Sequence, residues 1–384
     1  MSRSYNLHGK IVYFKIENAY AVWFKATHKF LMIEEPAFFI FRLLLKNVSS
    51  EGIAQRFSIR YNNPTSEVRK FVVEIEQNLH QYLDSPEKDQ SIKEEFITNS
   101  LPTQTFYTEK TYSIKNKFLN FCFGDKELEN VIHPLISHHE IKEKSNKNHL
   151  FQIYRIADKL SLRVDGDIIE TFDFAETGFL KAAVLMKLLG ILYEVENKDW
   201  MMTFHASAVT DGSSAIVFPA MAGSGKSTLT ALLHAHGFKM LSDDFLAVDL
   251  INKYIYHLPV AATIKNGSFN VLSPHFPELK DISEERAFTG KQVRYLPIST
   301  FFDTKKGFKA KSFVFVNFAD DKTFKFEEVT KKLAIQRLLQ ETWVNPKPHI
   351  VSEFFKWFDK IEFYELTYSK TSDAIAVVTK LFKQ

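Results

Sequence analysis

The stretch SSAIVFPAMAGSGKSTLTALLHAHGF, residues 213–238, decides the fold because it combines a strand, a loop and a helix in that order. AIVFP, residues 215–219, has the length and composition of a short buried strand. TLTALLHAHG is typical of a helix that ends at Gly237. The segment between them, residues 220–227, is rich in small residues. This order predicts an α/β domain built around a phosphate-binding loop.

Such a loop suits a triphosphate, because successive backbone N–H groups and a helix amino terminus can surround a phosphate without obstruction by side chains. Lys226 is placed to reach the β- and γ-phosphates, Ser227 to ligate Mg²⁺ and Thr228 to contact the α-phosphate. The strict pattern begins with Gly, whereas Ala220 stands there; the alternative is a Gly-rich turn without a ligand. The residues expected to hold ATP and Mg²⁺ are Ala222, Gly223, Ser224, Gly225, Lys226, Ser227 and Thr228.

Two adjacent acids follow the predicted helix. FKMLSDDFLAVDL predicts a second strand at 238–241 whose carboxyl end delivers Asp243 and Asp244 toward the γ-phosphate. Neighbouring side chains diverge, so one carboxylate can face the metal and the other the acceptor hydroxyl. We assign both to catalysis and Asp244 also to the metal, with the identity of the base left open; the alternative is a solvated turn or helix cap.

His205 lies in MMTFHASAVT, at the end of an apolar strand just before the loop strand. This position predicts a histidine beside the phosphates that takes or gives a proton, and we count it with Lys226 among the catalytic residues. The alternative is a hydrogen-bonded core histidine.

In order, HASAV with His205, AMAGSGKST and LSDD resemble the catalytic domain of the HPr kinase/phosphorylase family and of related kinases linked to phosphoenolpyruvate carboxykinases. The resemblance covers about residue 106 to the carboxyl terminus, and its specific signal lies at 205–249. It implies a protein or peptide serine kinase in which Asp243 and Asp244 assist deprotonation of the acceptor hydroxyl and bind metal. It also implies that His205 is a site residue.

One later part of the family pattern, an acidic metal ligand in a Gly-rich IRGLG-type segment, is not evident here. PVAATIKNGSFNVL, residues 259–272, looks like the divergent branch of related kinases, with Lys265 as a candidate phosphate contact. HPr itself is therefore not assumed to be the target. Lys291 and Arg294 are placed either to neutralise charge on the transferred group or to lie on the surface.

The amino-terminal segment predicts a small winged-helix-like α+β domain, residues 1–85. IVYFKIENAYAVWF and KFLMI have the composition of paired strands, and three helical patterns follow them. EEPAFFIFRLL, SSEGIAQRF and the helix after YNNPTSEV resemble the PqqD-like domains that recognise leader segments of ribosomally made peptides. The resemblance implies that a leader peptide adds to the strand edge around 14–21 and rests against the third helix.

A DNA-binding winged helix is the competing interpretation of this domain. Its basic residues, Arg56, Arg60, Arg69 and Lys70, are too few and too spread for a nucleic-acid surface. The formal charge of +3 over 384 residues also gives no global field, so we expect no nucleic-acid partner.

Residues 86–105 are polar and punctuated by Pro, which predicts a linker before a kinase-like domain at 106–384. The amino terminus lacks a signal-peptide pattern and the most apolar helical stretch is too short for a bilayer, so we expect a cytoplasmic protein without a membrane partner. The single cysteine, Cys122, excludes an internal disulfide framework. The oligomeric state is open, a homo-oligomer included.

Together these patterns predict an ATP-dependent phosphotransferase that phosphorylates a serine-type hydroxyl of a peptide or small protein, such as a ribosomally made precursor peptide. Two alternatives stay open: a small-molecule kinase, and a nucleotide-gated peptide-binding protein without transferase activity.

Overall fold

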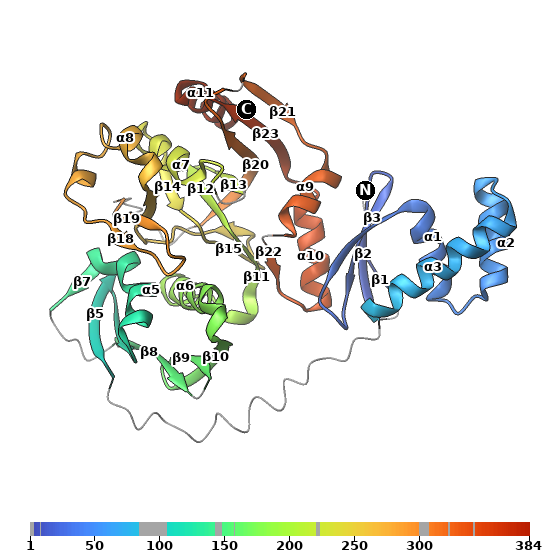
Figure 1. Ribbon diagram of the computed structural model, residues 1–384, viewed down its shortest axis with the longest axis horizontal. Helices are drawn as coiled ribbons and strands as arrows, with labels where there is room; N and C mark the ends of the chain where they lie inside the picture. The colour runs from blue at the N-terminus through green and yellow to red at the C-terminus, as the bar shows by residue number, and fades with distance from the viewer. Residues whose placement is uncertain are drawn as a thin grey trace. The chain divides into compact units, whose positions relative to one another are not determined.

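The computed structural model describes residues 4–7, 9–83, 106–142, 148–156, 158–219, 223–298, 307–321, 323–340 and 342–384. The chain forms two compact units (Figure 1). The first contains Met1–Ser100 and Val329–Lys360, and the second contains Leu101–Glu328 and Ile361–Gln384. Helices and mixed sheets occur together, which confirms the expected α/β class. The linker expected at 86–105 lies entirely outside the described residues.

The first unit is built on an antiparallel sheet whose strands follow one another in chain order. They are β1 (Ser4–Leu7), β2 (Ile11–Ile16), β3 (Ala19–Phe24) and β4 (Phe30–Glu34). Side chains alternate between the two faces of a strand, and in β2 and β3 both sets are buried except at the exposed Lys15 and the half-buried Tyr20. Tyr13 and Val22 belong to the core that the sheet shares with the helices after it. The sheet therefore needs cover on both faces.

Three helices cover one face: α1 (Glu35–Leu44), α2 (Ser50–Tyr61) and α3 (Thr65–Leu83). Pro36 occupies the first turn of α1, where its missing N–H costs no hydrogen bond. The Ser49 hydroxyl caps α2 by accepting a hydrogen bond from the Gly52 N–H at 3.3 Å. The three helical patterns of the sequence are thus observed.

A distant segment covers the other face. α10 (Pro348–Phe358) packs on β2 with Phe355 stacked on Phe14 at 5.3 Å between ring centroids. The same segment supplies α9 (Lys331–Leu338) and β22 (Thr342–Val344) to the first unit. No local sequence pattern indicates this grouping, because periodicity reports a buried face and not its partner.

The prediction that a peptide adds to a strand edge around residues 14–21 is wrong, because these strands are interior in the structure. Phe14 of β2 is paired with both Ser4 of β1 and Ala21 of β3. Ala21 is paired in turn with Met32 of β4. Both strands are interior, so their backbone groups already have partners. Among the described residues, β1 and β4 are the edge strands of this sheet.

The second unit begins with a sheet of order β10-β9-β8-β6-β5-β7. Its strands are β5 (Thr108–Ile114), β6 (Lys117–Phe123), β7 (Glu140–Ile141), β8 (Asn148–Ile156), β9 (Lys159–Val164) and β10 (Asp167–Asp173). Two helices, α5 (Lys126–Ile136) and α6 (Thr177–Tyr193), share its core. The buried leucine and valine side chains of α6 recur at three- and four-residue spacing, which is the pattern of a helix with one buried face.

A larger mixed sheet follows, in the order β14-β12-β13-β20-β16-β15-β11, and β23 also pairs with β20 and β21. Its strands are β11 (Trp200–Phe204), β12 (Ala206–Thr210), β13 (Ala215–Pro219), β14 (Lys239–Ser242), β15 (Leu246–Asp249), β16 (Tyr254–Ile255), β20 (Phe308–Phe318), β21 (Lys325–Glu328) and β23 (Glu362–Tyr368). β13, β20 and β23 run parallel, so their carboxyl ends share one edge of the sheet.

Helices α7 (Lys226–Ala235) and α11 (Thr371–Lys383) share a core with β13, β20 and β23. A small sheet of order β17-β19-β18 packs beside α7. It contains β17 (Ala262–Lys265), β18 (Glu285–Arg286) and β19 (Gln292–Leu296), with the turns η4 (Asn266–Ser268) and α8 (Phe269–Leu272) after β17. Within the described part of the chain, no helix is long and apolar enough to cross a membrane.

Candidate functional site

The glycine-rich loop lies between β13 and α7, as the sequence predicts. Gly223 and Gly225 have φ of +94° and +93°, the left-handed region that glycine enters without steric cost. α7 begins at Lys226, directly after Gly225. Ala220 and Ala222 lie outside the described residues. The loop therefore brings Lys226, Ser227 and Thr228 to the amino end of α7, where free N–H groups favour an anion.

The end of β20 braces this loop. The Phe318 N–H donates a hydrogen bond to the Ser224 carbonyl at 3.1 Å. A Cβ added to Gly225 would lie 3.0 Å from the Phe318 Cβ, so the second glycine is required by close approach as well as by its φ. This contact joins segments far apart in the sequence.

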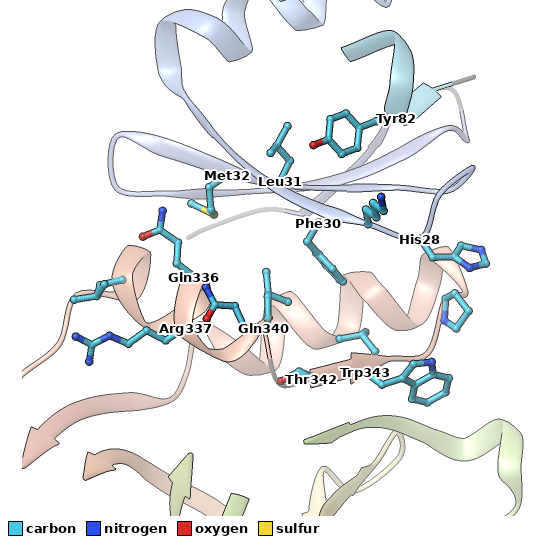
Figure 2. A pocket seen from close by; sticks show the side chains of 15 residues that line it. His28, Phe30, Leu31, Met32, Tyr82, Gln336, Arg337, Gln340, Thr342 and Trp343 are labelled. Atoms are coloured by element: carbon cyan, nitrogen blue, oxygen red, sulfur yellow. The ribbon is translucent and has the colours of Figure 1, made fainter. Parts of the chain in front are cut away.

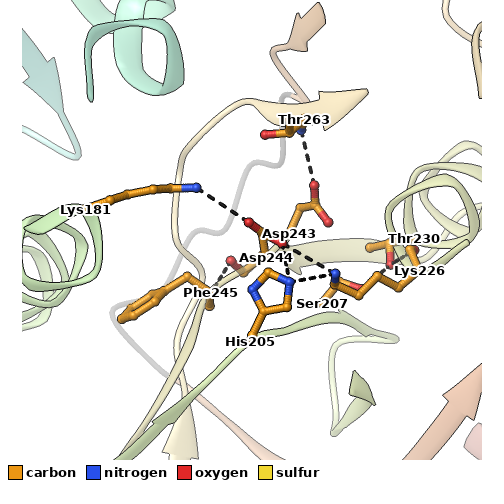
Figure 3. A network of polar contacts seen from close by, with 10 residues as sticks. Lys181, His205, Ser207, Lys226, Thr230, Asp243, Asp244, Phe245 and Thr263 are labelled. Atoms are coloured by element: carbon orange, nitrogen blue, oxygen red, sulfur yellow. Dashed lines mark hydrogen bonds and ion pairs between the residues drawn. The ribbon is translucent and has the colours of Figure 1, made fainter. Parts of the chain in front are cut away.

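Lys226 meets His205 and Asp244 (Figure 3). Its Nζ lies 2.9 Å from His205 Nε2 and 3.4 Å from Asp244 Oδ1. His205 stands between β11 and β12, and its Nε2 lies 2.8 Å from the same carboxylate oxygen. The Lys226 side chain is buried, whereas His205 and Asp244 are half-buried. The structure therefore brings together three residues that the sequence assigned to the site.

Asp244 also contacts a residue that sequence reasoning missed. Lys181 of α6 places its Nζ 3.5 Å from Asp244 Oδ2. Burial alone would raise the pKa of Asp244, but the hydrogen bond with His205 and the charges of Lys181, His205 and Lys226 hold that pKa well below its usual value. Asp244 is therefore an anion surrounded by cations. A single lysine on a helix carries no motif that would have indicated it.

The neighbouring acid occupies a different environment. Asp243 is buried, its Oδ2 accepts the Thr263 N–H at 3.2 Å, and the Ser227 side chain lies beside its carboxylate. Asp244 has φ of +74°, so the backbone turns sharply between the two acids and their side chains diverge. Burial and the charge of Asp244 raise the pKa of Asp243. The acid beside Ser227 is thus Asp243, whereas the sequence predicted that Asp244 binds the metal together with Ser227.

This environment fits a divalent cation. Asp243 Oδ1 is a buried acceptor without a hydrogen-bond partner among the described residues. Carboxylate and hydroxyl oxygens are ligands that Mg²⁺ prefers, and Ser227 provides the hydroxyl. The residues that fit Mg²⁺ are therefore Asp243 and Ser227.

The segment from β17 to η4 forms a wall beside α7. The hydroxyl of Thr228 lies 2.5 Å from that of Ser268 in η4. Lys265 ends β17, and burial together with the charges of Lys291 and Lys226 lowers its pKa. A lysine whose pKa is lowered by neighbouring positive charges would gain from a bound polyanion. This wall supports the assignment of Lys265 and adds Ser268 to the candidate site.

Arg294 has a different set of contacts. Its guanidinium donates to the Asn266 side chain at 2.9 Å and to the Ile282 carbonyl at 3.1 Å, and it lies 3.5 Å from Glu284. These contacts tie the turns around β17 and β19 together. Of the two cations considered at 291 and 294, Lys291 is the one whose charge acts on Lys265.

A second candidate site lies wholly within the first unit. A groove of about 920 Å³ runs between β4, α9 and β22 (Figure 2). Phe30 and Met32 point from β4 toward α9, and the half-exposed Trp343 stands on β22. The lining includes Lys29 and Arg337, and no described lining residue is acidic. The groove combines apolar surface, positive charge and the edge of a strand.

Neither a scan against models of protein families nor a search of curated proteins finds a match to this chain.

Proposed function

We propose that this chain is an ATP-dependent kinase with a P-loop core of the HPr kinase type, which phosphorylates a serine-type hydroxyl of a peptide or small protein. One observation carries the proposal. Lys226, His205 and Asp244 are in mutual contact at the amino end of α7, with Asp243 and Ser227 beside them. A phosphate-binding loop of any class needs the lysine; the histidine and the second acid are what a group-transfer enzyme adds.

ATP binding would use the loop as its cradle. The N–H groups at the start of α7 and the buried Lys226 would hold the β- and γ-phosphates, and Lys265 would add charge from the wall opposite. Ser227 and Asp243 would hold Mg²⁺, which when bound neutralises phosphate charge. The hydrogen bond from Phe318 to Ser224 and the close approach of Phe318 to Gly225 would brace these two loop residues, so less ordering of them would be needed when ATP binds.

In the transfer step, the acceptor hydroxyl oxygen forms a bond to the γ-phosphorus while the bond from that phosphorus to the β,γ-bridging oxygen breaks and ADP leaves. The hydroxyl proton passes to Asp244, the more exposed of the two acids, whose hydrogen bond with His205 orients it. A low pKa does not disqualify this base, because phosphoryl transfer depends mainly on positioning and charge stabilisation. Lys226 stays on the phosphates through the reaction.

The first unit would hold the peptide as a winged-helix-like, PqqD-like module. β4 is an edge strand, and an extended peptide can add to such an edge through main-chain hydrogen bonds. The groove along β4 offers apolar contacts at Phe30 and Met32 and positive charge at Lys29. The peptide segment bound there is therefore extended, with apolar side chains on one face and acidic residues among the others.

The experiment is transfer of labelled γ-phosphate from ATP by the full chain to an array of extended serine-containing peptides. Lys226→Met should abolish labelling, and Asp244→Asn should abolish labelling while ATP binding is kept. Lys187→Met on α6 is the matched control and should label normally. Labelling of small hydroxyl compounds but no peptide would support the small-molecule kinase instead. Peptide binding that requires ATP, without labelling, would support a nucleotide-gated binding protein.

A further inference from the structure

The two oxygens of Asp244 have different partners. Oδ1 is shared by His205 at 2.8 Å and Lys226 at 3.4 Å, whereas Oδ2 faces Lys181 at 3.5 Å (Figure 3). The two lysines come from different elements, α7 and α6. Asp244 is thus paired on both sides.

The pairing of Lys226 with Asp244 competes with the role proposed for Lys226. An ammonium group cannot remain centred on a carboxylate and also move onto the phosphates of ATP, so binding must weaken this ion pair. Asp244 would then carry a negative charge beside an incoming polyanion, in a half-buried site where charges are poorly screened. Besides His205, a cation that does not move onto the phosphates has to compensate this charge.

Lys181 is in a position to do so without moving. Its side chain is only 16% exposed, and its Nζ also lies 5.9 Å from the centre of the Phe288 ring. The neighbours Leu180 and Val184 are buried in the core of the second unit, which holds this part of α6 in place. Because Lys181 uses the oxygen that Lys226 does not, it can stay on Asp244 after Lys226 leaves.

We propose that Lys181 is a positioning residue that compensates Asp244 and so releases Lys226 for the phosphates of ATP. Lys181 acts through Asp244 and does not touch the nucleotide. The inference rests on the proposed function only in taking ATP with Mg²⁺ as the ligand. It predicts an energetic coupling between Lys181 and Asp244 that ATP affinity reports.

The test is a double-mutant cycle on the full chain, with ATP affinity measured by titration calorimetry in the presence of Mg²⁺. Lys181→Met should weaken ATP binding about tenfold, a typical size for coupling between contacting charges. In the Asp244→Asn background, the same change should leave ATP affinity unaltered, because no carboxylate is left to compete for Lys226. Lys181→Arg keeps the positive charge and should bind ATP as tightly as the unmodified chain. Lys187→Met on the same helix should not change the ATP affinity.

An equal loss in both backgrounds would overturn the proposal, because Lys181 would then contact the nucleotide or support the fold. Unchanged affinity in Lys181→Met alone would also overturn it. Should Lys181→Met fail to fold, as judged by thermal unfolding, Lys181→Gln takes its place in the cycle. If the unmodified chain binds no ATP, the proposed function falls together with this inference; if it binds ATP and the cycle is additive, only the inference falls.

Discussion

The loop site of the second unit and the groove of the first are assembled in opposite ways. Apart from Lys181, the bracing Phe318 and the charge of Lys291, the site at the glycine-rich loop draws its residues from one stretch, between His205 and Ser268. The groove joins β4 to α9, and the ion pair between Glu34 and Lys332 beside it links residues 298 positions apart. One site is local in the sequence and the other is not.

The difference shows what makes a site visible before its structure is known. Phosphate chemistry requires particular residue types at particular spacings, so it leaves a motif. A peptide groove needs apolar surface and a strand edge, which ordinary half-buried apolar residues such as Phe30 and Met32 supply. Its position depends on which distant helix packs beside the strand.

The largest effect is expected from the packing of α10 on the first sheet. It tests whether the distant segment that lines the groove belongs to the first unit. Phe355 is fully buried and stacked on Phe14, so Phe355→Ala should destabilise the first unit by about 3–5 kcal/mol. Urea unfolding of the full chain, followed by circular dichroism, measures the loss. Phe71→Ala, at an exposed position on α3, is the control and should cost far less. A loss below about 1 kcal/mol would mean that residues 329–360 do not belong to this unit.

Removal of the Lys226 side chain tests the site at the glycine-rich loop. Lys226→Met should lower kcat/KM for phosphoryl transfer at least about 100-fold, because a buried charge aimed at the phosphates is lost. Affinity for a peptide selected from the array should stay the same, since the groove lies in the first unit. Radiolabel transfer and fluorescence anisotropy measure the two quantities. Loss of both together would show that the two sites are not separable.

Alanine variants of the two loop glycines distinguish the effect of backbone strain from that of close packing. Gly223→Ala strains the left-handed backbone at this position, although the added Cβ would have no described atom within 4 Å. It should therefore weaken ATP binding by about 1 kcal/mol. Gly225→Ala adds a clash with Phe318 and should cost about 1 kcal/mol more. Titration calorimetry with ATP compares them. Equal losses would indicate that the end of β20 does not brace the loop.

The smallest effect is expected from the charge of the groove. Lys29→Glu should weaken binding of an acidic peptide by a factor of about three, and the effect should shrink as salt is added, because the charge is exposed. Lys46→Glu changes the net charge equally at an exposed position outside the groove lining, and serves as the control. If both variants bind peptide equally at low salt, the groove does not select for acidic residues.

Much of the secondary structure could be predicted because apolar periodicity is local. The apolar segment predicted as a buried strand at 215–219 is β13, and the helix predicted after the glycine-rich loop is α7. The peptide edge around 14–21 was placed wrongly because strand composition does not say which strands are interior. The grouping of α10 with the first sheet was beyond reach for the same reason: an amphipathic helix does not name its partner.

By itself the sequence determined that a glycine-rich loop precedes a helix beginning at Lys226 and that a histidine and two acids flank it, because spacing along one chain limits where these residues can lie. Tertiary structure alone decided that Asp243 faces Ser227 while Asp244 faces Lys226 and Lys181. That choice depends on the left-handed backbone at Asp244 and on how α6 packs, and both follow from contacts between residues distant in the sequence.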